Sequence, residues 1–247
     1  SSRIFSLGVL NAQGQQRGVS YPDFLDWRDQ SRTMAEIAGT VGASINVSEE
    51  GKTPEQYRGS YISAGLFRLI GEKPVIGRGF TDADDQKGAE PVALLTNGMW
   101  KKRYGGDPSV LGRTFKANSK VVTVIGVMKP DMQFPNNDDL WMPLEQLPVA
   151  TLDPRREIRN LNVIGQLKKD ATLAQAQAEF AAIGQRLADT FPADKDFKPQ
   201  LMTFDDRMNG GPIRIVFLTL MGAVAFVLLI ACADVANLLL ARASHRS

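Results

Sequence analysis

Cysteine and histidine are nearly absent from this chain of 247 residues. The single cysteine is Cys232 and the single histidine is His245, both close to the C-terminal end. The long preceding part therefore cannot hold a disulfide, a cysteine- or histidine-ligated zinc ion, a Ser-His-Asp triad or a Cys-His pair. A site built from carboxylates alone stays open, because acidic residues distant in sequence can meet in a fold, but no pattern points to one. We expect no catalytic residue, no cofactor, no metal ligand and no enzymatic activity.

An excess of charge of one sign is also lacking. The formal net charge is +2, which gives no strong field for nucleic acid or an acidic polymer, so we expect no nucleic-acid partner. The hydrophobic content of 43% and the charged content of 23% indicate a globular protein and not a disordered one. The chain begins at Ser1 without Met and without a signal peptide, and we interpret it as a piece of a longer protein.

One segment lacks charge altogether. The 19 residues from Ile215 to Ala233 read IVFLTLMGAVAFVLLIACA, and a helix needs about 20 residues to cross the hydrocarbon core of a membrane. The rest of the chain has the mixed polarity of a water-soluble domain. The sequence therefore predicts a soluble domain followed by a transmembrane helix over residues 212–242.

The charges that flank this segment predict its orientation. Arg242, His245 and Arg246 follow it with no acidic residue among them, and positive charge near the end of a membrane helix marks the cytoplasmic side. Arg214 at the other end opposes this assignment. On balance, we expect residues 1–211 to be extracytoplasmic.

Asp234 is a carboxylate within the predicted membrane helix. Such a group costs roughly 2–3 kcal/mol at the bilayer centre and less near the interface, and Asp234 lies nearer the cytoplasmic end. We interpret it as a side chain that reaches the interface or forms an interhelical hydrogen bond. A relay of protons or substrate is the alternative.

Hydrophobic periodicity and turn residues predict alternating strands and helices. Strands are expected at Arg3–Leu7, Ala43–Val47, Gln56–Ile62, Pro91–Leu95, Arg113–Lys116, Lys120–Val127, Leu161–Leu167 and Lys198–Phe204. Helices are expected at Ala64–Ile70, Asn97–Tyr104 and Thr172–Thr190. A further helix is expected to begin at Ser20 and to end at Gly39 and Gly42, and its buried face would consist of Phe24, Trp27, Met34 and Ile37. Gly14–Gly18 is expected to be a loop. The order indicates an α+β fold with split βαβ units at the two ends of the soluble part.

Two kinds of local signal refine this picture. The pairs that fit helix capping boxes are Ser20 with Asp23 and Thr172 with Gln175. The tryptophans lie among apolar neighbours, so we expect core packing and not a ligand groove for Trp27, Trp100 and Trp141.

Two loops resemble binding motifs but fail on spacing. The Gly-Lys-Thr stretch at 51–53 joins two predicted strands and lacks the first glycine of a phosphate-binding loop, because Asn46 stands there. The acidic stretch at 82–85 lacks the glycine that a calcium loop needs at its sixth position, because Lys87 stands there. We interpret the second as a solvated acidic loop, and an irregular cation site there stays open.

Several segments together resemble the periplasmic core domain of MacB-like permeases. They are Ser20–Met34, Ile62–Phe80, Pro91–Phe115 and Val124–Pro135. Val227–Ser244 is similar to the start of the FtsX-like permease region. The nearest group is the duplicated orphan ABC permeases best known from acidobacteria, and the resemblance covers essentially the whole chain in the family's order. That family commonly has Asn where this chain has Asp234.

The resemblance implies a two-lobed periplasmic domain followed by one transmembrane helix. Residues 1–74 and 151–211 would form a porter-like lobe with split βαβ units, and residues 75–150 a β-rich, sabre-like insert. The helix at 212–242 would start the FtsX-like permease region as the second membrane helix, the first lying before Ser1. The family offers no catalytic or substrate-binding residue that transfers to this sequence.

The resemblance also implies a function. The chain would belong to a permease subunit of the bacterial inner membrane that couples ATP hydrolysis by a separate cytoplasmic subunit to transport or mechanotransmission. The implied partners are that ATP-binding cassette subunit, a second permease copy or half, and a periplasmic protein. Two alternatives stay open: a membrane-anchored periplasmic sensor that regulates a partner such as a cell-wall hydrolase, and a membrane-tethered hydrolase that uses carboxylates only.

Overall fold

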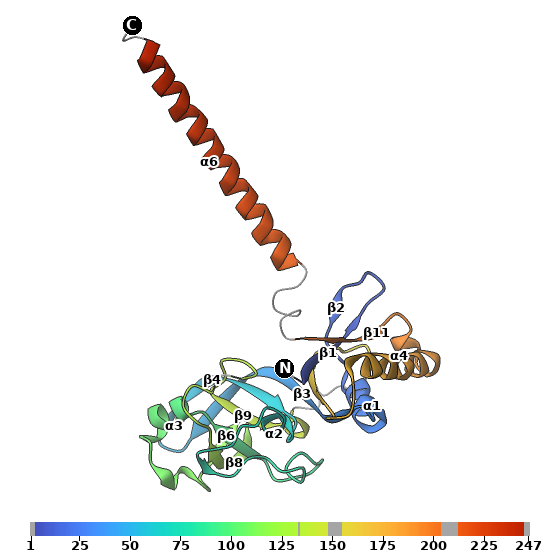
Figure 1. Ribbon diagram of the computed structural model, residues 1–247. Helices are drawn as coiled ribbons and strands as arrows, with labels where there is room; N and C mark the ends of the chain where they lie inside the picture. The colour runs from blue at the N-terminus through green and yellow to red at the C-terminus, as the bar shows by residue number, and fades with distance from the viewer. Residues whose placement is uncertain (1–2, 133, 148–154, 204–211, 245–247) are drawn as a thin grey trace. The chain divides into compact units, whose positions relative to one another are not determined.

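The computed structural model describes residues 3–132, 134–147, 155–203 and 212–244, and in the last range the side chains of residues 217–233 and 235. The chain separates into two compact units, Ser1–Met202 and Thr203–Ser247, which are described one at a time. Figure 1 follows the chain from the strands of the first unit to helix α6 (Pro212–Ser244) of the second.

The first unit is built on a sheet of eleven strands. Their bounds are β1 Ile4–Leu10, β2 Gln16–Arg17, β3 Met34–Glu49, β4 Lys52–Ile62, β5 Ile76–Gly77, β6 Val92–Leu95, β7 Thr114–Ala117, β8 Lys120–Val127, β9 Leu140–Pro143, β10 Asn162–Leu167 and β11 Lys198–Met202. The order along the sheet is β11-β1-β10-β3-β4-β9-β6-β8-β5, with β2 added to β1 and β7 paired with both β3 and β8. This mixed α+β architecture agrees with the predicted fold class.

Short helices complete the first unit. They are α1 Tyr21–Gln30, α2 Leu66–Leu69, α3 Asn97–Tyr104 and α4 Leu173–Thr190, with 3-10 turns η1 Pro108–Val110, η2 Leu144–Gln146 and η3 Pro192–Asp194. The capping box predicted for α4 is confirmed, because the Thr172 hydroxyl accepts from Gln175 N–H and the Gln175 side chain accepts from Thr172 N–H. At α1 the Ser20 hydroxyl accepts from Asp23 N–H, while the Asp23 carboxylate is used elsewhere.

The helix predicted from Ser20 is wrong in its second half. Helix α1 ends at Gln30, and Ser31 already has extended backbone. Met34 and Ile37 are buried as predicted, but they lie in strand β3. Their spacing fits a helix and a partly buried strand equally, and the choice between them is made by a contact with a distant part of the chain.

That contact comes from Glu179 of α4. Its carboxylate accepts hydrogen bonds from the Arg32 and Thr33 N–H groups at 2.8 and 3.0 Å, and from the Ser31 and Thr33 hydroxyls at 3.1 and 2.5 Å. These bonds hold the turn between α1 and β3. Since the partners are almost 150 residues apart in sequence, local pattern could not reveal the turn.

Two glycine-rich stretches also differ from their predictions. Gly39 and Gly42 do not end a helix but lie inside β3, where Gly39 pairs with β10 and Gly42 with β4. In the segment predicted as the Gly14–Gly18 loop, Gln16 and Arg17 form β2 by pairing with the end of β1. In both places the partner strand supplies the hydrogen bonds that decide the conformation.

The hairpin of β3 and β4 takes part in both halves of the sheet. Toward one side β3 pairs with β10, over Met34–Thr40. Toward the other side the strand pairings close a ring, in which β3 pairs with β4, β4 with β9, β9 with β6, β6 with β8, β8 with β7, and β7 again with β3. A closed ring leaves none of its members as a free edge.

Helices α1 and α4 cover the part of the sheet that contains β1, β3 and β11 (Figure 1). Trp27 of α1 and Phe180 of α4 meet edge to face with ring centroids 5.4 Å apart, a geometry worth about 0.5–1.5 kcal/mol beyond burial. Helix α4 lies directly on β11, because a Cβ added to Gly184 would stand only 2.4 Å from Pro199 Cδ. Glycine is therefore required at this crossing.

The closed ring has its own apolar centre. Trp141 of β9 is fully buried, stacks edge to face against Phe67 of α2, and donates to the Asp138 carboxylate. Trp27 is equally buried, whereas Trp100 is only partly buried and donates to the Asp107 carbonyl. The prediction that the tryptophans pack in the core is confirmed for Trp27 and Trp141.

The second unit consists of α6, an uninterrupted helix of 33 residues. Its described side chains are mostly apolar and exposed, among them Phe217, Phe226 and Val235. Counting only the residues that the structure describes, which in α6 means the side chains of 217–233 and 235, no helix is long and apolar enough to cross a membrane. The side chains of Asp234 and Arg242 and the residue Phe204, the predicted end of the last strand, lie outside the described residues.

The Glu179→Gln substitution is expected to lower the free energy of unfolding by about 1 kcal/mol near neutral pH, because hydrogen bonds to a charged acceptor are lost. Burial by itself raises the pKa of Glu179, but the hydrogen bonds from Thr33, Arg32 and Ser31 outweigh it and lower the pKa below 4.5. Stabilisation from such a group is complete above the unfolded-state pKa and is lost as the pH falls through the folded-state pKa.

Urea unfolding followed by tryptophan fluorescence between about pH 7 and about pH 3 measures this contribution. Wild-type stability should fall below pH 4.5 more steeply than that of the Glu179→Gln variant. The control is Asp189→Asn on the same helix. Asp189 is exposed, and its carboxylate accepts from Gln185 and from no other group among the described residues, so this variant should keep the wild-type slope. Equal slopes for wild type and Glu179→Gln would contradict the prediction.

Candidate functional site

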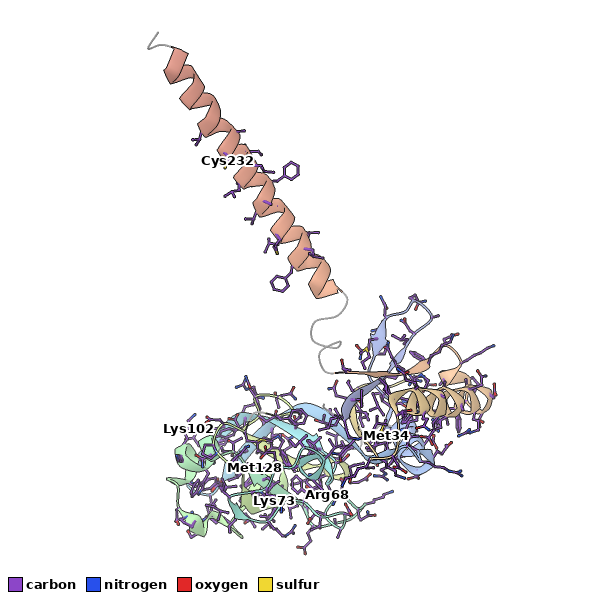
Figure 2. The ribbon with its side chains drawn as sticks, viewed as in Figure 1. Met34, Arg68, Lys73, Lys102, Met128 and Cys232 are labelled. Carbon is purple, nitrogen blue, oxygen red and sulfur yellow. The ribbon has the colours of Figure 1, made fainter. Side chains whose placement is uncertain are left out.

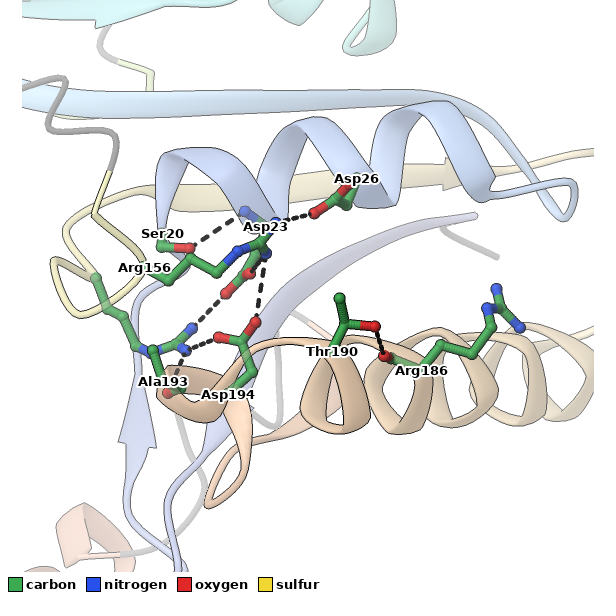
Figure 3. A network of polar contacts seen from close by, with 9 residues as sticks. Ser20, Asp23, Asp26, Arg156, Arg186, Thr190, Ala193 and Asp194 are labelled. Atoms are coloured by element: carbon green, nitrogen blue, oxygen red, sulfur yellow. Dashed lines mark hydrogen bonds and ion pairs between the residues drawn. The ribbon is translucent and has the colours of Figure 1, made fainter.

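A network of buried charges joins three distant parts of the first unit (Figure 3). Arg156 and Arg159 come from the segment that directly precedes β10. Asp23 lies in the first turn of α1, and Asp194 lies in η3, just before β11. Figure 3 shows Asp23 and Asp194 pointing toward the arginine side chains. The network therefore fixes where the chain re-enters its first half.

Each arginine contacts two or more aspartates. Arg159 donates through Nη1 to Asp23 Oδ2 and through Nη2 to Asp194 Oδ1, both at 2.5 Å. Arg156 donates to Asp23, to Asp26 Oδ2 at 2.5 Å and to Asp194 Oδ2 at 3.3 Å. Because Asp23 and Asp194 are each shared by both arginines, the four side chains form one connected unit.

The network is shielded from water. The side chains of Asp23, Arg159 and Asp194 are 3, 5 and 6% exposed. Two aromatic rings cover the guanidinium groups: Phe191 lies 3.7 Å from Arg156 and Phe197 lies 3.9 Å from Arg159, measured from ring centroid to Cζ. These cation–π contacts stabilise both guanidinium groups in their places.

The network contains more carboxylates than guanidinium groups and so carries excess negative charge. Two arginines face three aspartates, including the half-exposed Asp26. Burial and the neighbouring Asp23 charge raise the pKa of Asp194, and Arg159 and Arg156 only partly offset this. Burial lowers the pKa of Arg156, but Asp26 and Asp23 outweigh it, so the pKa is raised. Such a cluster positions backbone segments and supplies no nucleophile.

The acidic loop at 82–85 has protein partners for each carboxylate. Asp84 accepts from Arg78 at 2.7 and 2.9 Å and from Thr81. Asp85 accepts from the Ala64 and Glu145 N–H groups at 3.1 Å. Asp82 contacts Arg68, which also bonds to Glu36 of β3. Among the described residues no three His, Cys, Asp or Glu side chains are grouped to hold a metal ion.

Two hollows lie beside these contacts. One, of about 280 Å³, is lined mainly by charged residues of the acidic loop, α2 and β3, including Arg28, Glu36, Arg68 and Asp85. The other, of about 920 Å³, runs along the C-terminal half of α4 and the start of β11, and Lys195 and Lys198 border it.

Sequence reasoning did not find the network. Arg156 and Arg159 lie in a segment without regular pattern, and nothing in it indicates aspartates more than 30 and 130 residues away. The only local signal is the spacing of two arginines three positions apart in a segment before a predicted strand. Asp23 was interpreted as a capping residue, which explains its backbone contact but not its carboxylate.

Solved structures of low sequence identity share this fold. The periplasmic region of MacB from Actinobacillus actinomycetemcomitans has a TM-score of 0.60 at 15% identity, covering 84% of this chain and 91% of that one. The extracellular domain of the noncanonic ABC-type transporter YknZ from Gram-positive bacteria has a TM-score of 0.57 at 16% identity, covering 80% and 99%. A domain assigned to a permease from Porphyromonas gingivalis has a TM-score of 0.64 at 14% identity, covering 82% and 90%.

The fold is thus that of extracytoplasmic domains found on bacterial permeases. The chain belongs to the family described as the MacB-like periplasmic core domain, whose model matches residues 1–183. The predicted resemblance is confirmed by this match. The family is one of permease-type periplasmic domains and not of enzymes. Comparison with curated proteins gives no match.

The Asp23→Asn substitution is expected to lower the free energy of unfolding by about 3 kcal/mol, because it removes the buried carboxylate that both arginines share and takes the charged acceptor from Arg159 Nη1. The matched control is Asp29→Asn on the same helix, where the pair with Arg28 is exposed and the loss should be under about 0.5 kcal/mol. Urea unfolding followed by tryptophan fluorescence measures both. Similar losses for the two variants would show that the network does not stabilise the domain.

Proposed function

We propose that this chain is the periplasmic domain and the second membrane helix of an ABC-type, MacB/FtsX-like permease subunit. The observation that carries the proposal is the order of its two units along the chain. A domain of the MacB-like periplasmic core family is followed directly by a 33-residue helix with apolar side chains on its surface. An exposed apolar surface of this extent is unfavourable in water and favourable in lipid.

In this proposal α6 crosses the bacterial inner membrane and residues 1–211 lie in the periplasm. The uncharged run from Ile215 to Ala233 supports the crossing, since it approaches the length of a membrane span. The basic residues Arg242 and Arg246 that follow support a cytoplasmic C-terminal end. Asp234 lies near that end, where a carboxylate is less costly than at the bilayer centre.

The two lobes keep their proposed boundaries at 1–74 with 151–211 and at 75–150. The antiparallel arrangement of β11, β1, β10 and β3 under α1 and α4 supports the first lobe. The pairings of β5 to β9 among themselves support the second. The β3–β4 hairpin links them, because its strands pair with both sets.

The proposed activity is mechanical. A separate cytoplasmic ATP-binding subunit moves the membrane helices, and α6 passes the movement to the periplasmic domain through residues 203–211 and strand β11. The Arg156–Arg159 network lies against η3, shortly before β11, and thus at the N-terminal end of that strand, where the path continues into the domain. A second permease copy or half and a periplasmic protein complete the proposed machine, which transports a substrate or transmits force.

Cys232 offers a direct test of the membrane position of α6, because it is the only cysteine in the chain. It lies four residues from the midpoint of α6, about 6 Å along the axis, and so within the hydrocarbon core. In lipid vesicles a membrane-impermeant maleimide should leave Cys232 unlabelled until detergent is added. The Lys87→Cys variant in the exposed acidic loop, made with Cys232→Ser, is the positive control. Equal labelling of both positions in intact vesicles would exclude the spanning helix.

The ATPase test addresses the permease role itself. The full-length protein, co-reconstituted with the ATP-binding subunit encoded beside it, should raise that subunit's rate of ATP hydrolysis several-fold. A variant that lacks residues 3–202 is expected to assemble with the ATP-binding subunit as the full-length protein does. Its rate of ATP hydrolysis should respond differently to a periplasmic ligand. Absence of stimulation by any such subunit, together with activation of a cell-wall hydrolase by the periplasmic domain, would replace the permease role with a regulatory one.

A further inference from the structure

A second charged cluster lies at the tip of the β3–β4 hairpin, against the end of α3. It surrounds a pocket of about 250 Å³ lined by Lys52, Thr53, Glu55, Tyr57, Lys102 and Arg103. Figure 2 shows Lys102 at the end of the domain that carries α3, away from α4. The proposed mechanical role does not account for three cations at this pocket.

Arg103 is the centre of the cluster and is not fully satisfied. Its side chain is only 4% exposed. The Nε group donates to Glu49 Oε1 at 2.8 Å, and Nη1 lies 3.5 Å from Glu55 Oε2. The Nη2 group is buried and has no hydrogen-bond partner among the described residues. A buried donor without an acceptor costs free energy. A ligand that supplies the acceptor removes this cost.

The carboxylate that faces Arg103 from β3 cannot supply it. Glu49 already accepts from Arg103 Nε, from the Tyr104 hydroxyl at 2.8 Å and from Lys52 Nζ at 3.3 Å. Glu55 is about half exposed, at 46%, and accepts from the Tyr57 hydroxyl. The pocket thus has three cations and two carboxylates, one of which is fully engaged.

Two lysines bring further donors to the same pocket. Lys52 uses two of its three N–H groups, on Glu49 and on the Arg103 carbonyl at 3.4 Å, so one remains. The bond to that carbonyl also offsets the negative end of α3, which would otherwise repel an anion. Lys102 is exposed and forms no ion pair among the described residues.

We propose that this pocket binds a phosphate group. Arg103, Lys52 and Lys102, which all line the pocket, donate to its oxygens, and the Thr53 hydroxyl adds a neutral donor. A phosphate suits separate donors arriving from a hairpin and a helix, because it presents several strong acceptor oxygens and pairs well with guanidinium and ammonium groups. Glu55 competes with the anion for Arg103. The phosphate comes from solution or from the headgroup of an anionic lipid, which share this chemistry.

The test uses the whole chain in detergent and inorganic phosphate as the probe, with binding measured by isothermal titration calorimetry. Lys102→Gln should weaken binding about fivefold, as expected for loss of one exposed charge contact. Lys101→Gln is the matched control, since Lys101 is the neighbouring exposed lysine of α3 and does not line the pocket. Glu55→Gln should strengthen binding by a similar factor, because it removes the competing carboxylate.

The opposite effects of Lys102→Gln and Glu55→Gln on phosphate affinity distinguish a specific phosphate site from general attraction of anions to a basic surface. Equal weakening by Lys102→Gln and Lys101→Gln, or absence of phosphate binding at millimolar concentration in the wild type, would overturn the proposal. A second titration with short-chain phosphatidic acid, and short-chain phosphatidylcholine as its control, identifies the source. Lys102-dependent binding of phosphatidic acid tighter than that of inorganic phosphate assigns the site to a lipid headgroup, and the reverse order assigns it to free phosphate.

Discussion

The β3–β4 hairpin is the element on which the rest of the first unit depends. Its strands pair with each other from Thr40 to Glu49, and β3 continues back to Met34 along β10. The same two strands close the ring through β9 and β7. Without the hairpin, the antiparallel strands under α1 and α4 would have an open edge, and strands β6 to β9 would lose the partners that close their ring. The two halves of the sheet are therefore stabilised by one shared pair of strands.

The first unit contains two clusters of charged residues, one around Arg159 and one around Arg103, and they differ in their surroundings. Around Arg159 both Nη groups donate to buried aspartates, and an aromatic ring covers the guanidinium. Buried ion pairs of this kind are weak sources of net stability but are selective for one geometry. Each cluster leaves one buried guanidinium nitrogen without a hydrogen-bond partner among the described residues, Nε of Arg159 and Nη2 of Arg103. The clusters differ in charge balance, because three aspartates face two arginines in the first, whereas three cations line the pocket at the second.

Local sequence predicted the elements whose stability is local. Helix α4 has its capping box and apolar stripe within 18 residues, and α3 and most strands were also placed within a few residues. The same reasoning failed between Ser31 and Ile37, because the turn is held by Glu179 from another helix. It also failed for β2, which exists only through its pairing with β1. The arginine network was missed for the same physical reason, since each of its contacts joins parts of the chain that are distant in sequence.

The pairing pattern also restricts how the two halves of the sheet can move. The ring cannot open at one strand without losing a whole ladder, and β3 is fastened to β10 up to Thr40 and to β7 from Val47. Between these points, over residues 41–45, β3 has a strand partner on one side only, namely β4, among the described strands. This stretch contains Gly42, where an added Cβ would meet no atom closer than 3.6 Å. A bend there breaks no hydrogen bond to β10 or β7, so it is the least costly place for the sheet to flex.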